Sequence, residues 1–119
     1  MHGDFWPGNV LWHDGHIAAL LDWEDACIGD PLIDLACMRS ELFRVAGAEA
    51  VARFTHACAR HVAIDPARLP WWDLFMATAP LLYMDGWGLA PDELATRRAA
   101  STRWQARALH ALGVGGTSA

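Results

Sequence analysis

The sequence predicts an α+β fold that is mainly α-helical, with one short β-hairpin followed by about four helices. The hairpin is predicted by Asp14-Gly15, which lies between two apolar runs and is a strong signal of a two-residue turn. From about residue 30 onward, apolar residues recur at helical spacing and are interrupted by glycine and proline. We therefore expect a single domain that begins with the hairpin.

The predicted turn also fixes which residues of the two strands face each other. With a two-residue turn, Asn9 lies opposite Leu20. Side chains alternate along a strand, so Asn9, Leu20 and Asp22 would share one face, with Asn9 and Asp22 roughly 7–8 Å apart as diagonal neighbours. The opposite face is apolar and is expected to be part of the core; its members are Val10, Trp12, Ile17, Ala19 and Leu21.

The helical part is expected to follow a loop at residues 23–29. Asp30 is predicted to cap the first helix, with Pro31 at its first position, and Gly47 to end it. A kink is expected at Pro80, inside the third helix. The expected helices cover about 31–45, 48–62, 71–85 and 91–112, and residues 113–119 are expected to form a flexible tail.

Asp4 and Asn9 stand five positions apart across a loop that contains Pro7 and Gly8. This is the spacing of a phosphoryl-transfer catalytic loop, in which the Asp orients the attacking hydroxyl and the Asn binds metal. Asn9 and Asp22 offer oxygen ligands that suit Mg²⁺, which keeps several waters. Taken singly, these residues are common in turns and caps. Together with the hairpin they predict a phosphoryl-transfer site with Asp4 as its base.

Three motifs, in this order, carry a resemblance to a known family. They are His2-Gly3-Asp4-x4-Asn9, Leu21-Asp22-Trp23-Glu24 and Gly29-Asp30-Pro31-x2-Asp34-Leu35-Ala36. They resemble the C-terminal lobe of the aminoglycoside phosphotransferase (APH) family, which has the protein-kinase-like fold. The resemblance covers residues 2–36, and beyond residue 40 only the helical periodicity is compatible with it.

The resemblance implies an ATP-dependent phosphotransferase that transfers a phosphoryl group to a small-molecule hydroxyl, with Mg²⁺ and ATP or another nucleoside triphosphate as cofactors. It implies that Asp4 is the catalytic base and that Asn9 and Asp22 hold the magnesium. Residues 1–112 would form a partial kinase-like C-terminal lobe, with the catalytic loop and hairpin in 1–29 and a helical subdomain in 30–112. The residues expected to support the site structurally are His2, Asp30 and Asp34.

Trp6, inside the catalytic loop, and Glu24, beside Asp22, are expected to contact the substrate. Residues 1–38 contain seven acidic residues and no Lys or Arg, which favours a cationic hydroxyl substrate and argues against nucleic acid as a partner. A sugar, an amino alcohol or a macrolide fits these residues equally well. The aromatic residues Trp71, Trp72, Tyr83 and Trp87 are interpreted as core rather than as a substrate-binding wall.

The cysteines and the apolar runs bear on the location of the protein. Cys27, Cys37 and Cys58 form no CxxC pair, which favours reduced cysteines in a cytoplasmic protein. The longest apolar run, residues 74–84, is too short to cross a bilayer, so no membrane partner is expected.

Parts of a complete phosphotransferase are missing from the sequence. There is no lysine, and the glycine-rich segment at 113–116 is not followed by a helix. Because a lysine normally neutralises the nucleotide phosphates, the nucleotide-binding lobe is expected to come from elsewhere, including from sequence upstream of Met1. The apolar content of 54% predicts exposed surface that such an N-terminal lobe, or self-association, would cover.

Two other functions are compatible with the motifs. One is an inactive kinase-like remnant or binding module, which an absence of Mg²⁺ and nucleotide binding would favour. The other is a metal-dependent hydrolase that uses His2, Asp4 and Asp22, although this spacing lacks a transition-metal ligand set.

Overall fold

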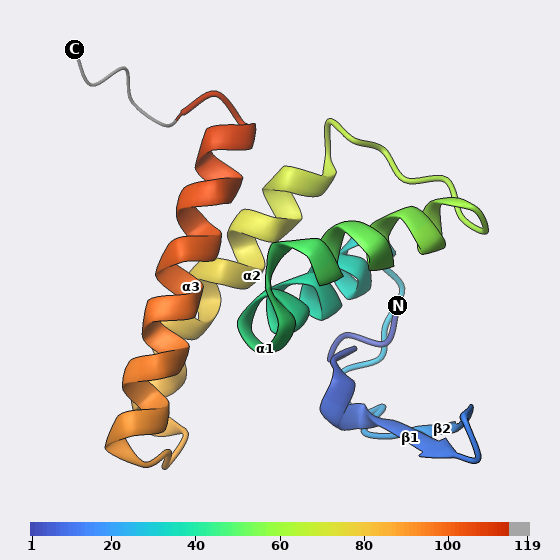
Figure 1. The fold of residues 1–119 in the computed structure, drawn as a ribbon, viewed down its shortest axis with the longest axis horizontal. Coiled ribbons are helices and arrows are strands. Elements are labelled where there is room, and N and C mark those ends of the chain that lie inside the picture. The colour runs from blue at the N-terminus through green and yellow to red at the C-terminus, as the bar shows by residue number, and fades with distance from the viewer. Residues whose placement is uncertain (115–119) are drawn as a thin grey trace.

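The computed structural model describes residues 1–114 and has the predicted architecture, a two-stranded hairpin followed by helices. The three helices pack against one another, and the hairpin extends from them on the side of the N-terminus (Figure 1). The elements in chain order are the 3-10 helix η1 (Pro7–Asn9), β1 (Val10–His13), β2 (His16–Leu20), α1 (Leu32–Ala59), α2 (Leu69–Tyr83), the 3-10 helix η2 (Met84–Gly86) and α3 (Pro91–Ala111).

The hairpin turn is confirmed at Asp14 and Gly15. Their φ angles are 47° and 77°, and positive φ at both central residues is what a type I′ turn requires. His13 pairs with His16 across the turn, as expected.

The register farther from the turn differs from the prediction. The pairing shifts between Leu11 and Trp12, where β2 contains one residue more than β1. As a result, Asn9 pairs not with Leu20 but with Leu21, whose amide donates to the Asn9 carbonyl at 2.8 Å. A bulge interrupts the alternation of side chains, so the expected common face of Asn9 and Asp22 does not follow from strand geometry.

The hairpin face that was expected to be core is largely exposed, and that prediction is wrong. Trp12 is 65% exposed and Ile17 is 56% exposed, and Leu21 is also exposed. The physical reason is that the helices pack on one another rather than on the hairpin (Figure 1).

Helix α1 begins where its cap predicts and is interrupted at Gly47. The Asp30 carboxylate accepts a hydrogen bond from the Leu32 amide at 3.1 Å, so Asp30 caps the helix although Pro31 precedes its first residue. Gly47 has φ 81° and ψ −176°, which are not helical angles. The chain resumes its helix after Gly47, so the two helices predicted around this glycine are the two halves of α1.

The other helices lie close to their predicted bounds. Helix α2 starts at Leu69, two residues before the expected start, and it continues through Pro80 to Tyr83. Helix α3 ends at Ala111, one residue before the expected end. None of the described helices is long and apolar enough to cross a membrane. Of the predicted flexible tail, residues 115–119 lie outside the described residues.

The hydrophobic core belongs to the helices. One cluster joins the start of α1 to the start of α2 and contains Leu32, Leu35, Ala36 and Leu69. A second cluster joins all three helices and contains Val51, Ala77 and Trp104. The packed helices therefore form the core, and the N-terminal loop and hairpin lie outside it.

Candidate active site

The predicted catalytic loop is attached to α1 by Asp34. One carboxylate oxygen of Asp34 accepts a hydrogen bond from the His2 amide at 2.7 Å, and the other accepts one from the Gly3 amide at 2.8 Å. Hydrogen bonds to a carboxylate are among the stronger ones in proteins. Because Asp34 lies in the first turn of α1, these bonds give the loop a fixed position on the helical core.

Gly3 allows the loop to pass close to the segment that follows the hairpin. Its φ of 91° is unfavourable for residues with a side chain, and a Cβ at this position would lie 2.5 Å from the Asp25 carbonyl oxygen. Backbone hydrogen bonds between Met1 and Cys27 hold the same two segments together. The loop therefore requires glycine between His2 and Asp4.

The buried His2 ring links the two segments that carry the predicted site. Its Nδ1 accepts a hydrogen bond from the Asp4 amide at 3.2 Å, and its Nε2 lies 2.8 Å from the Leu21 carbonyl oxygen. Since Nδ1 accepts and Nε2 must donate, the ring is neutral with its proton on Nε2. The exposed Trp23 packs on the ring with centroids 4.5 Å apart. Both ring nitrogens are engaged, which argues against the hydrolase alternative with His2 as a metal ligand.

Asp4 and Asn9 are brought together as their spacing predicts. The buried Asn9 amide nitrogen donates to the Asp4 carbonyl oxygen at 2.9 Å and to its carboxylate at 3.0 Å. These bonds orient the Asp4 carboxylate. Because the Asn9 nitrogen is used in this way, the Asn9 amide oxygen is the atom left for a metal ion.

Asp22 lies next to this pair along the backbone. It directly follows Leu21, whose amide bonds to Asn9 and whose carbonyl bonds to His2. Asp22 is exposed and has a φ of 61°. Within residues 1–114, no hydrogen bond joins its carboxylate to Asp4 or Asn9, and no three His, Cys, Asp or Glu side chains form a metal-binding group. An amide oxygen with one carboxylate suits Mg²⁺, which retains waters, better than a zinc site.

Asp30 joins the start of α1 to the start of α2. Besides capping α1, it accepts a hydrogen bond from the Trp72 indole at 2.8 Å and forms an ion pair with Arg68. Its carboxylate is therefore occupied by structural contacts rather than directed at a ligand.

A cleft of about 540 Å³ opens beside Asp4. Trp6 lines it, as expected of a substrate contact, whereas Glu24 is not among the residues that form it. The lining residues are Asp4, Trp6, Cys37, Ser40, Glu41, Phe75, Met76, Ala79, Pro80, Tyr83, Trp87, Leu89 and Arg97.

In a comparison with protein families, the model of the phosphotransferase enzyme family (APH) matches residues 1–72. The chain belongs to this phosphotransferase family. The matched segment contains the loop, the hairpin, Asp30, Asp34 and all of α1. Searches of curated proteins and of solved structures found no match.

The part of the cleft that is formed by α2, α3 and the segment between them, here called the far wall, lies outside both the family match and the sequence motifs. Phe75, Tyr83, Trp87 and Arg97 all follow residue 72. The interpretation of Trp71, Tyr83 and Trp87 as core residues is wrong, since all three are exposed; Tyr83 and Trp87 line the cleft. Trp72, by contrast, is partly buried against the core. Trp87 lies in the break between α2 and α3, and this position was the one available signal that it does not belong to a buried helix face.

Cys37 faces the cleft beneath Asp4 without being a nucleophile. Burial raises the pKa of its thiol to about 12, and the negative charges of Asp4, Glu41 and Asp34 add to the effect. A thiolate is the reactive form of cysteine, so the Cys37 thiol is a neutral part of the cleft lining at physiological pH.

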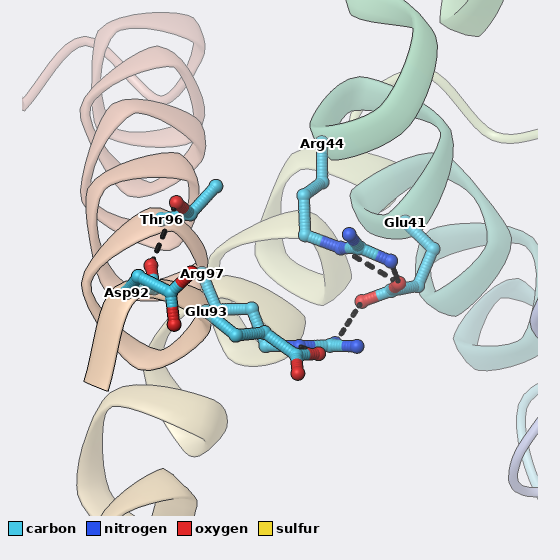
Figure 2. A network of polar contacts seen from close by, with 6 residues as sticks. All are labelled: Glu41, Arg44, Asp92, Glu93, Thr96 and Arg97. Atoms are coloured by element: carbon cyan, nitrogen blue, oxygen red, sulfur yellow. Dashed lines mark hydrogen bonds and ion pairs between the residues drawn. The ribbon is translucent and has the colours of Figure 1, made fainter. Parts of the chain in front are cut away.

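Glu41, on α1, is held by arginines from two helices (Figure 2). Arg44 donates two hydrogen bonds to one of its carboxylate oxygens, at 3.0 and 2.7 Å. Arg97, from α3, lies 3.8 Å from the other oxygen and donates to Glu93 at 3.0 Å. The negative charge of Glu41 is therefore balanced within the protein.

Proposed function

We propose that the chain provides the catalytic lobe of an ATP-dependent phosphotransferase that acts on a small-molecule hydroxyl. The observation that carries this proposal is the pair of hydrogen bonds from the Asn9 amide to Asp4, at the edge of a cleft. Membership of the phosphotransferase family supports the reaction class.

In the proposed reaction, the acceptor hydroxyl lies in the cleft and its oxygen bonds to the terminal phosphorus of the nucleotide. The bond from that phosphorus to the bridging oxygen breaks, and the nucleoside diphosphate leaves. Asp4 orients the hydroxyl and takes its proton. His2 and Asn9 hold Asp4 in place through its amide, carbonyl and carboxylate groups, and Asp34 holds the loop. Positioning of this kind supplies a large part of catalysis in phosphoryl transfer.

The Asn9 amide oxygen and the Asp22 carboxylate would hold Mg²⁺, which when bound neutralises charge on the phosphates. Because the chain contains no lysine, we expect phosphorylation to require a nucleotide-binding segment supplied in cis or in trans. The exposed hairpin residues Trp12 and Ile17 are available to contact such a segment or a second copy. We propose a cytoplasmic setting, with neither nucleic acid nor membrane as a partner.

Calorimetric titration with Mg²⁺ tests the metal site. Asp22→Ala should weaken Mg²⁺ binding at least about tenfold. Asp14→Ala, which removes an exposed carboxylate at the hairpin turn, is the matched control and should leave the affinity unchanged. Equal affinities in the two variants would overturn the proposed metal site.

Measurement of the turnover rate tests the proposed role of Asp4 as the catalytic base. In an ATP-dependent assay with the nucleotide-binding segment present, Asp4→Asn should lower kcat by about 10²–10⁴-fold. If the wild-type chain binds neither Mg²⁺ nor nucleotide at millimolar concentrations, the inactive-remnant alternative is correct instead.

A further inference from the structure

We infer that the acceptor in the cleft beside Asp4 is a neutral hydroxyl compound with an extended apolar ring system, rather than a polycation. The inference rests on the proposed function only in that the bound hydroxyl is the one phosphorylated. Binding of the compound can be measured separately.

The far wall of the cleft is aromatic and open to solvent. Phe75 is 51% exposed, Tyr83 is 66% exposed and Trp87 is 49% exposed, and Trp6 lines the cleft from the side of the catalytic loop. The core aromatic Trp104, by contrast, is almost fully buried. Aromatic faces left exposed in a concave site provide apolar surface against which the ring of a ligand packs.

The charges around the cleft do not favour a polycation. Three of its lining side chains are charged at neutral pH, namely Asp4, Glu41 and Arg97, and Glu41 is already paired with arginines. Among the described residues that line the cleft, Asp4 is then the one carboxylate free for a ligand, and its proposed task is the hydroxyl. Arg97 is itself paired with Glu41 and Glu93, so a second ammonium group would find no further free carboxylate among the described residues that line the cleft.

Apart from Asp4, the acidic residues of the N-terminal segment lie outside this cleft. Asp14, Asp22, Glu24 and Asp25 are all exposed, and none of them lines the cleft. The exposed acidic residues of this segment therefore belong to the surface around the hairpin rather than to the cleft. For this reason the structure points away from the cationic substrate that the sequence favours.

The size of the cleft agrees with a large ring system. About 540 Å³ lies within the range of pockets that hold drug-sized ligands, roughly 300–1,000 Å³. A small amino alcohol would leave most of the aromatic wall uncovered. A fused-ring or macrocyclic alcohol would cover it while one hydroxyl reaches Asp4.

Binding of two probes to the full chain tests the inference. Estradiol serves as the neutral ring alcohol and kanamycin as the polycation, and both are titrated by calorimetry. Estradiol should bind at least about tenfold more tightly than kanamycin, and Trp87→Ala should weaken estradiol binding about tenfold, because an aromatic face is lost. Trp87→Phe should restore most of the affinity. Trp71→Ala, at an exposed position outside the cleft, should change nothing.

Three results would overturn the inference. They are kanamycin binding as tight as that of estradiol, equal estradiol affinity in Trp87→Ala and Trp71→Ala, and no estradiol binding up to its solubility limit.

The Mg²⁺ titrations distinguish failure of this inference from failure of the proposed function. A chain that binds Mg²⁺ through Asp22 but prefers kanamycin keeps its function and loses only the substrate class. If the chain binds estradiol but no Mg²⁺, the inferred ligand class is kept and the proposed metal site fails.

Discussion

The two parts of the molecule are held together by different forces. In residues 1–31 the buried residues are His2 and Asn9, both polar and both in the loop that is predicted to be catalytic. In the helical part, residues 32–111, the buried residues are apolar except for Asp73. The loop therefore depends on a few directed hydrogen bonds, whereas the helices depend on packed apolar surface. Single polar substitutions should disturb the site locally, and the stability of the chain should be determined by the helices.

The exception in the helical part is expected to give the largest effect. Arg39 donates to both carboxylate oxygens of Asp73, at 3.0 and 2.8 Å; the Asp73 side chain is buried, and the Arg39 side chain is largely shielded from solvent. Burial raises the pKa of Asp73 even though Arg39 opposes this shift. Asp73→Ala leaves the largely shielded Arg39 charge without its carboxylate partner, so the free energy of unfolding in urea should fall by about 3–5 kcal/mol.

A double variant distinguishes the cause of that loss. Arg39→Met combined with Asp73→Leu removes both charges and should recover most of the stability. If the double variant is as unstable as Asp73→Ala, the loss comes from packing. The stability of the helical part would then depend on packing even at its one buried charged residue.

Asp34→Ala should have the next largest effect, and it tests the link between the two parts. It removes the acceptor of two backbone hydrogen bonds, so unfolding should become easier by about 1.5–3 kcal/mol. Mg²⁺ affinity, measured by calorimetry, should fall as well, because the loop loses its position on α1. Asp34→Asn keeps one acceptor oxygen and should give a smaller change. Unchanged Mg²⁺ binding in Asp34→Ala would show that the loop holds its geometry without α1.

Cys37, at the boundary between the two parts, should give a smaller effect that depends on pH. Its pKa is raised from 9.0 to about 12 in the folded chain. Above pH 9 the unfolded thiol ionises while the folded thiol keeps its proton, so this contribution to stability is present below pH 9 and is lost as the pH rises towards 12. Cys37→Ala should reduce the stability lost between pH 7 and pH 10 by about 1 kcal/mol, measured in urea at both values.

Cys27→Ala is the control for this experiment, because Cys27 is exposed. An equal change in both variants would mean that partial burial and the nearby negative charges do not raise the pKa of Cys37.

Trp104→Phe should give the smallest effect. Trp104 packs on Phe43 with centroids 4.8 Å apart, and its buried indole nitrogen has no hydrogen-bond partner within residues 1–114. Phenylalanine removes the unsatisfied donor but leaves a small void, and these changes oppose each other. Thermal unfolding should show a net change below about 1 kcal/mol, whereas Trp104→Ala should cost about 3–5 kcal/mol. A large loss in Trp104→Phe would mean that the indole nitrogen has a partner in solution.

Local signals made much of the fold predictable. The Asp14-Gly15 turn, the Asp30 cap and the break at Gly47 each depend on the conformational preference of a few neighbouring residues, and each is found. The juxtaposition of Asp4 and Asn9 is equally local, because η1 closes the short loop between them.

The features that depend on distant contacts could not be predicted in this way. The bulge in the hairpin changes the partner of Asn9, and no single residue of the sequence predicts this bulge. The exposure of Trp12 follows from where the helices pack, and the aromatic wall with Tyr83 and Trp87 follows from how α2 meets the segment before α3. Tertiary packing decides such positions, and periodicity within one segment does not reveal it.

The backbone angles at the Gly47 break in α1 would favour a D-amino acid over an L-amino acid at this position. A Cβ at this position would meet no atom within 4 Å, so space does not exclude other residues. The obstacle is the pair of backbone angles, φ 81° and ψ −176°, a region that is almost exclusive to glycine among the natural amino acids. The mirror image of these angles is an ordinary extended conformation. A D-amino acid at position 47 would thus adopt the bend of α1 with ease, whereas its L-counterpart would resist it.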